Sequence, residues 1–197
     1  MTNIINLFNF IESNRPEYKT PVKVKLIYDH ESLTKDDLNV GGDLNLYGTK
    51  ITTLPDNLTV GGSLYLQNTP ITTLPDNLTV GGGLYLRNTS ITTLPDNLKV
   101  GSDLNLENTP ITTLPDNLNV GRNLNLFRTP ITTLPYNLTV GDTLALSRTP
   151  ITTLPDNLKV VGNLYLSDTP LSKQYSKDEI RKMIEDKGGN VGGDIYI

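Results

Sequence analysis

The sequence contains no cysteine, no tryptophan and only one histidine, His30, in 197 residues. Without cysteine, the chain can form no disulfide framework, no thiolate nucleophile and no cysteine-based zinc or iron–sulfur site. This composition suits a reducing compartment. The first residues lack the basic start, apolar run and cleavage site of a signal peptide, and no stretch approaches the roughly 20 apolar residues that cross a bilayer. We therefore expect a cytoplasmic protein with no membrane contact.

Positive charge is also scarce, because 17 Lys and Arg residues stand against 21 Asp and Glu residues, for a net charge of −4. Residues 31–170 hold eight Lys and Arg against thirteen Asp and Glu, a balance of −5. A protein that follows a phosphate backbone needs a basic stripe. The charge distribution therefore disfavours a nucleic-acid partner.

Catalytic motifs are absent from the sequence as well. It contains no glycine-rich phosphate loop, no nucleophile elbow and no histidine-based metal motif. A repeated surface also lacks the single concave pocket that most catalysis requires. We expect no enzymatic activity and no cofactor.

What the sequence does contain is a repeat of twenty residues. The block ITTLPDNLTVGGSLYLQNTP begins at Ile51 and recurs from Ile71, Ile91, Ile111, Ile131 and Ile151. The apolar frame extends back to Leu38 and Leu44, and once more to Val24 and Leu26. A fixed period of this size indicates a solenoid in which each coil packs on its neighbours. We divide the chain into an N-terminal helical cap and first strand (1–30), the repeats (31–170) and a C-terminal helix and closing strand (171–197).

Each block predicts one coil of a mainly β solenoid. Residues 63–67 alternate so that Leu64 and Leu66 point inward, and the equivalent strands of successive coils form one parallel sheet. Gly61-Gly62 and Pro55-Asp56-Asn57 are turn signals. No block holds a helical stretch, so the convex side should consist of extended segments and turns.

The phrase LxLxxTxIxxLPxxLxV, which covers about residues 23–170, resembles the leucine-rich repeat. Thr69 stands where that family usually has an asparagine. The short period with Leu-Pro is similar to the LPX-type repeats of bacterial effectors and of repeat proteins from phages and bacteria. The resemblance implies a protein-binding solenoid. Effectors of this type that act as ubiquitin ligases carry a catalytic cysteine in a separate domain, and the absence of cysteine excludes that activity here.

Both ends of the chain predict caps that cover exposed core. An amphipathic helix should include Ile4, Ile5, Leu7, Phe8 and Ile11 and stop before Pro16. Near the C-terminus, Ser176 and Glu179 form a capping-box pattern ahead of an apolar helix, and Gly188-Gly189 should end that helix. The final residues, 191–197, copy residues 40–46 and predict a closing strand at Ile195.

Variation among the blocks falls mainly on the outward strand positions and the bends beside them, while the ITTLP and DNL positions scarcely change. Exposed aromatic residues beside arginine are typical of interfaces. Aromatic residues also favour strands for structural reasons, and this alternative stays open. The candidate binding residues are Tyr47, Tyr65, Tyr85, Arg87, Glu107, Phe127, Arg128, Arg148, Tyr165 and Tyr196.

Two uniform columns allow other interpretations. The stacked aspartates Asp56, Asp76, Asp96, Asp116 and Asp156 could share a calcium ion, but Pro-Asp-Asn more commonly forms a turn in which Asp accepts backbone N–H bonds. The threonines could suggest an ice-binding surface. However, Thr52 and Thr53 are adjacent and should point in opposite directions, so we favour hydroxyls that bond neighbouring coils.

These observations favour a non-catalytic protein–protein interaction module that binds its partner through the face of the parallel sheet. The resemblance suggests a phage or bacterial accessory factor that inhibits or tethers a target protein. The alternative is a structural spacer or surface-binding solenoid, with or without stabilisation by calcium.

Overall fold

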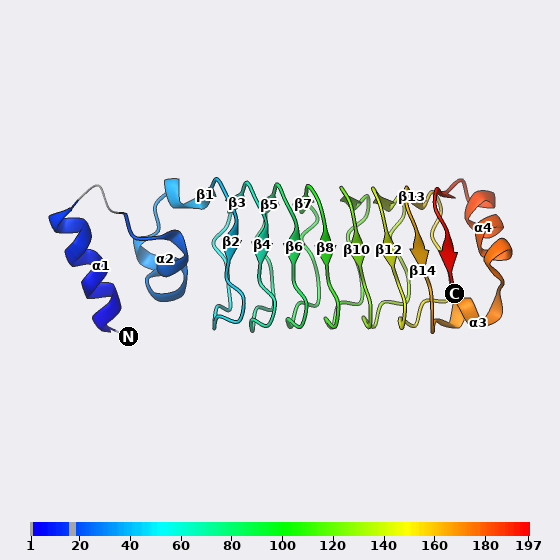
Figure 1. The fold of residues 1–197 in the computed structure, drawn as a ribbon, viewed down its shortest axis with the longest axis horizontal. Helices are drawn as coiled ribbons and strands as arrows, with labels where there is room; N and C mark the ends of the chain where they lie inside the picture. The colour runs from blue at the N-terminus through cyan, green and yellow to red at the C-terminus, as the bar shows by residue number, and fades with distance from the viewer. Residues whose placement is uncertain (1, 16–18) are drawn as a thin grey trace.

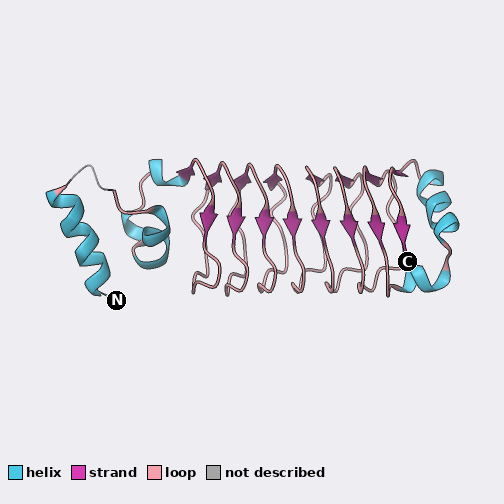
Figure 2. Ribbon diagram, viewed as in Figure 1, coloured by secondary structure: helices cyan, strands magenta, loops and turns pink. Residues whose placement is uncertain are grey.

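A computed structural model describes residues 2–15 and 19–197 of the chain (Figure 1). Coils of about twenty residues stack into an elongated, mainly β solenoid, with helices at both ends. Two parallel sheets of eight strands each run along its length (Figure 2). No helix in the described part of the chain combines the length and apolar character that spanning a membrane requires.

One sheet, named here the Leu sheet, is the sheet that the sequence predicts. Its strands begin with Leu or Ile and pair in register at intervals of one coil. The predicted strands centred on Leu44 to Leu164 are confirmed, and Ile195 completes the sheet opposite Leu164. The strands are β2 (Leu44–Asn45), β4 (Leu64–Tyr65), β6 (Leu84–Tyr85), β8 (Leu104–Asn105), β10 (Leu124–Asn125), β12 (Leu144–Ala145), β14 (Leu164–Tyr165) and β16 (Ile195–Tyr196).

The second sheet, named here the Val sheet, occupies part of the side for which the sequence predicts only extended segments and turns. Each of its strands ends in a valine whose side chain faces the core. The strands are β1 (Asn39–Val40), β3 (Thr59–Val60), β5 (Thr79–Val80), β7 (Lys99–Val100), β9 (Asn119–Val120), β11 (Thr139–Val140), β13 (Lys159–Val160) and β15 (Asn190–Val191).

The core is one continuous column of buried aliphatic side chains from Leu26 to Ile195. Thr69 is buried with it, and its hydroxyl donates to the carbonyl of Leu66 at 2.7 Å. The same bond recurs in the following coils, so the prediction that these hydroxyls link neighbouring coils is wrong. The bond lies within one coil because the bend after each Leu-sheet strand brings the hydroxyl onto the carbonyl three residues back. Thr52 and Thr53 are both exposed.

A column of glycines allows the coils to approach each other. A Cβ added at Gly81 or Gly101 would overlap the carbonyl oxygen of the glycine twenty residues earlier. The backbone of one coil therefore occupies the space that a side chain of the next would need. This close approach explains why Gly-Gly follows Val60 and Val80.

The Val sheet is interrupted at one step. β7 and β9 share only the pair Val100–Val120, whereas the other neighbouring strands of this sheet share two pairs. The N–H groups of Thr139 and Gly141 bond the preceding coil, but those of Asn119 and Gly121 make no such bond. A groove of about 520 Å³ lies over this step. The Leu sheet is fully paired here, and Gly121 still lies as close to Gly101 as glycines do at the neighbouring steps, so the Val sheet loses hydrogen bonds at this step without a wider spacing of the coils.

The N-terminal cap differs from its prediction. α1 (Thr2–Asn14) is confirmed as a helix, although the side chain of Ile4 and the whole of Pro16 lie outside the described residues. The expected first strand near Val24 is wrong, because Val22–Tyr28 forms a second helix, α2. Two 3-10 turns follow, η1 (His30–Ser32) and η2 (Asp36–Leu38).

α2 forms because Pro21 stands just before its first turn and no coil precedes this segment to pair with a strand. Leu26 is fully buried against the first coil. Lys25 donates to Asp37 at 3.0 Å, which attaches α2 to η2. The cap thus covers the core with a helix and adds no strand beyond β1 and β2 at this end.

The C-terminal cap consists of α3 (Pro170–Gln174), which the sequence reading missed, and α4 (Lys177–Asp186). The predicted capping box of Ser176 and Glu179 is confirmed, and Gly188 ends the helix in a left-handed conformation. Arg181 of α4 donates to the carbonyls of Val191 and Gly193 at 2.6 and 2.7 Å. These carbonyls belong to the last coil, so Arg181 satisfies acceptors that no further coil can reach.

Replacing Arg181 by alanine should lower the free energy of unfolding by about 2 kcal/mol, because two charge-assisted hydrogen bonds to the terminal coil are lost. Denaturant titration followed by circular dichroism measures this change. Lys182→Ala, an exposed neighbour on α4, is the matched control and should change stability little. Equal stability of the two variants would contradict a capping role for Arg181.

The amide hydrogens at the step between β7 and β9 should exchange faster than those at the next step of the Val sheet. We expect Asn119 and Gly121 to exchange at least about tenfold faster than Thr139 and Gly141, because only the latter pair is bonded to the preceding coil. Hydrogen exchange followed by NMR checks this. Equal exchange rates at all four residues would show that the missing hydrogen bonds form in solution.

Candidate binding face

The candidate site is the outer face of the Leu sheet together with the bend that follows each of its strands. The predicted residues all lie on this face, but they do not form one continuous patch. They group into a tyrosine stack on β4 and β6, a Phe–Arg cluster beyond β10 and β12, and a second tyrosine stack on β14 and β16. Tyr47 lies apart and accepts a hydrogen bond from Asn68 at 2.8 Å.

Tyr65 and Tyr85 form the first stack because the parallel register places them opposite each other. Their ring centroids are 5.0 Å apart and their planes differ by 7°. Gly83 makes room for this arrangement, since a Cβ there would meet the Tyr85 ring at 2.7 Å. Both tyrosines are therefore half-buried. The surface offers their ring edges and hydroxyls more than their stacked faces.

The hydroxyl of Tyr85 donates to Asp103 at 3.2 Å. Burial of the phenol, together with the nearby charge of Asp103 and this hydrogen bond, raises the pKa of Tyr85 above its usual value. Further along, Arg87 pairs with Glu107 at 3.4 Å. Two of the charged candidates thus compensate each other within the face.

Tyr165 and Tyr196 form the second stack, at 4.5 Å and 8°. The closing strand β16 supplies Tyr196, as the sequence predicts. Lys177, the first residue of α4, places its ammonium group 5.7 Å from the Tyr196 ring. The charge of Asp194 and the partial burial of the phenol raise the pKa of Tyr196. The C-terminal cap therefore contributes to the face as well as to stability.

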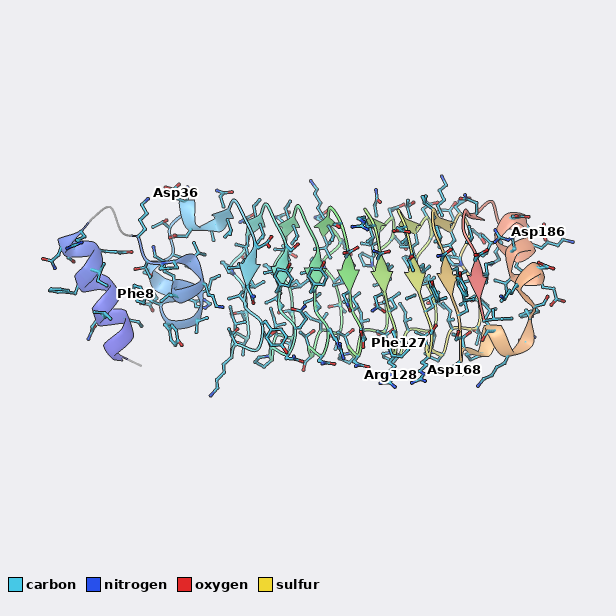
Figure 3. All side chains as sticks on the ribbon, in the orientation of Figure 1. Phe8, Asp36, Phe127, Arg128, Asp168 and Asp186 are labelled. Carbon is cyan, nitrogen blue, oxygen red and sulfur yellow. The ribbon has the colours of Figure 1, made fainter. Side chains whose placement is uncertain are left out.

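The Phe–Arg cluster joins two coils. The guanidinium carbons of Arg128 and Arg148 lie 5.0 and 5.5 Å from the centroid of the Phe127 ring. Arg148 also pairs with Asp168 at 3.3 Å. Figure 3 shows Phe127, Arg128 and Asp168 along one edge of the solenoid. Among the described residues, no carboxylate forms an ion pair with Arg128.

The backbone at these arginines is unusual. Arg128 and Arg148 have φ of 57° and 60°, in the left-handed region. The equivalent residues Asn68, Asn88 and Asn108 adopt the same conformation, which asparagine tolerates well. Their side chains also bond from coil to coil, as in the bond from Asn88 to Asn68 at 2.8 Å. An arginine there costs about 1–2 kcal/mol of backbone strain. It also ends the row of asparagine side-chain bonds, called here the asparagine ladder.

Other variable positions on the face have structural roles that the sequence reading missed. Asn45, Asn105 and Asn125 each accept the backbone N–H two residues further on, at 3.0 Å. Asp43 and Ser63, one position before the strand, accept a backbone N–H from the next coil. For the column that begins with Asp43 a signal was available in the sequence, because small hydrogen-bond acceptors dominate it.

The aspartate column lies along the bend before the Val sheet. The predicted turn is confirmed at each of these positions, but the part of the prediction in which Asp accepts a backbone N–H is wrong. Asp56, Asp76, Asp96 and Asp116 are exposed, and within the described residues their side chains accept no such bond. Asn57 shapes the bend instead, with φ of 60°. Asp156 pairs with Lys187 at 3.4 Å. No group of three or more His, Cys, Asp or Glu side chains suited to a metal ion occurs in the described ranges 2–15 and 19–197.

No family model matches this chain, and no curated protein matches it. Its class is therefore defined by its architecture. It is a parallel β-solenoid with a twenty-residue repeat, two sheets and helical ends.

Tyr85 should ionise at a higher pH than an ordinary tyrosine, whose pKa is about 10. Because the folded chain binds this proton more tightly than the unfolded chain, the associated stability is present below about pH 10 and is lost as the pH rises through the raised pKa. Asp103→Asn should lower the pKa of Tyr85 only in part, since burial is the largest cause. NMR titration of the tyrosine ring carbons measures both values, with Tyr85→Phe to assign the signal. An ordinary pKa in the parent chain would contradict the buried geometry.

Proposed function

We propose that this chain is a non-catalytic leucine-rich-repeat protein of the short LPX type that binds a partner protein through the Leu-sheet face. It acts in a reducing compartment such as the cytoplasm. By covering a surface of its target, it inhibits or tethers that target, as expected of a phage or bacterial accessory factor. No cofactor takes part.

The observation that carries this proposal is the replacement of local acceptors by aromatic residues. Asn45, Asn105 and Asn125 hold the bend of their own coil by accepting an N–H bond. Tyrosine at the same position of another coil, as at Tyr65 and Tyr85, offers no such acceptor. These coils exchange a structural bond for aromatic area on the surface. Such area is typical of binding hot spots, because a tyrosine ring contributes a large contact at low entropic cost.

Charge supports a protein partner over nucleic acid. The face holds both signs, with Arg87 beside Glu107 and Arg148 beside Asp168. The whole chain carries −4. A polyanion would meet repulsion along most of the solenoid, whereas a protein surface can present both signs in turn.

A spacer function is the second candidate, and the uniform exposed columns favour it. Thr52, Thr53 and Asp56 recur in later coils with little change, as a repeated scaffold with no partner would allow. A spacer requires length and rigidity but no particular aromatic residue on the Leu sheet. The two candidates therefore differ in their response to substitution of the stacked tyrosines.

The double change Tyr65→Ala and Tyr85→Ala should lower the affinity for a captured partner at least about a hundredfold, while the coils remain folded. We expect a loss of stability of about 1–2 kcal/mol, because the rings stack and are half-buried. Affinity capture from a bacterial lysate, with mass spectrometry, identifies the partner, and calorimetry then measures its affinity for each variant.

Tyr136→Asp is the matched control for this experiment. Tyr136 is an exposed aromatic residue on the opposite bend, at a position where the other complete blocks have aspartate. This variant should bind as tightly as the parent chain. Unchanged affinity of the Tyr65/Tyr85 double variant would reject the Leu-sheet face as the interface, and failure of the parent chain to retain any partner would favour the spacer.

A further inference from the structure

We propose that Arg128 and Arg148, held over Phe127, form a binding site for a carboxylate side chain of the partner protein. This inference rests on the binding function proposed above and names the chemistry that one part of the face recognises. Both guanidinium groups come from the bends that follow β10 and β12. They share one aromatic ring, at 5.0 and 5.5 Å from its centroid.

The fold does not require arginine at these two positions. Asn68, Asn88 and Asn108 occupy them in three other coils, with the same left-handed backbone and with side chains that bond from coil to coil. Arginine loses this ladder and adds backbone strain. Strain at a position where the repeat already has a better residue points to selection for another property, and on an exposed bend that property is binding.

The two arginines also lie in adjacent coils, so like charges are held near one another, which is unfavourable in the free protein. Asp168 compensates Arg148 at 3.3 Å. Among the described residues Arg128 has no such partner, and its side chain is exposed. The cluster therefore holds two positive charges and one negative charge. One further negative charge, placed between the guanidinium groups, would balance it.

A carboxylate meets this requirement better than a phosphate. It carries a single charge and can accept two parallel N–H bonds from a guanidinium fork. Phe127 provides an apolar support within 5.5 Å of both guanidinium carbons. A nucleic-acid phosphate would bring further charges toward a repeat region that already carries more Asp and Glu than Lys and Arg.

The test uses the full chain and a synthetic peptide of alternating glutamate and glycine, with its glutamine–glycine twin as the matched probe. NMR follows the side-chain Nε–H signals of arginine at low ionic strength. The signals that disappear in Arg128→Asn and Arg148→Asn identify the two residues. We expect both signals to shift and saturate with the glutamate peptide and not with the glutamine peptide. The affinity should fall at least about tenfold in the double variant.

Two controls separate site binding from general charge and from damage to the fold. Lys99→Asn with Lys159→Asn removes the same charge from the Val sheet and should leave the peptide affinity unchanged. The double arginine variant should melt no lower than the parent chain, because asparagine is the residue of the equivalent bends. A lower melting temperature would overturn the argument from strain.

The proposal is overturned if neither arginine signal responds to the glutamate peptide, or if both peptides shift them equally. It is also overturned if inorganic phosphate binds the two arginines at a concentration tenfold below the concentration of glutamate side chains that the peptide needs for the same shift. A captured partner that needs Tyr65 and Tyr85 but tolerates Arg128→Asn with Arg148→Asn would reject this site and leave the proposed function standing. If no partner is captured, the proposed function fails, and the peptide titration still decides the site.

Discussion

The hydrogen-bonded contact between one coil and the next is the constraint on which the rest of the structure depends. It repeats at the strand spacing of a parallel sheet, about 4.8 Å, in two sheets at once. At this spacing, side chains in equivalent positions of neighbouring coils touch each other. An inward leucine must therefore meet a leucine, and a bend that uses a left-handed residue must be followed by another such bend. The uniform sequence blocks are the consequence.

The same constraint determines what the surface can do. Apart from residues such as Asn105, which bond within their own coil, residues on the face bond to the neighbour twenty positions away, as Asn88 does with Asn68, or stack on it, as Tyr85 does with Tyr65. Arg128 and Arg148 do neither with each other, because like charges repel, and they use Phe127 as a common support. Departures from the ladder are thus concentrated at a few sites. These sites are where binding is proposed.

Most of the Leu sheet was predictable, because a period of twenty residues assigns each strand residue its neighbour without any knowledge of geometry. The place of Tyr196 beside Tyr165 does not follow from that count, because the C-terminal helices lie between them, but from the likeness of residues 191–197 to residues 40–46. The Val sheet was missed because a strand of two residues, such as Thr59–Val60, shows no alternation. Residues 22–28 alternate like a strand but form a helix, because no coil precedes them. The left-handed backbone at Arg128 was not predicted. Its positive φ depends on the shape of the bend, and that shape is seen only in the folded coils.

The weaker pairing between β7 and β9 has a consequence for where the rod is least stable. The Leu sheet is fully paired there, whereas the Val sheet keeps a single residue pair, so this step has fewer hydrogen bonds to break than its neighbours. The tyrosine stack on β4 and β6 lies on one side of this step, and Phe127 with its two arginines lies on the other. A local loss of structure in the rod would therefore begin between the two clusters and leave each of them on folded coils.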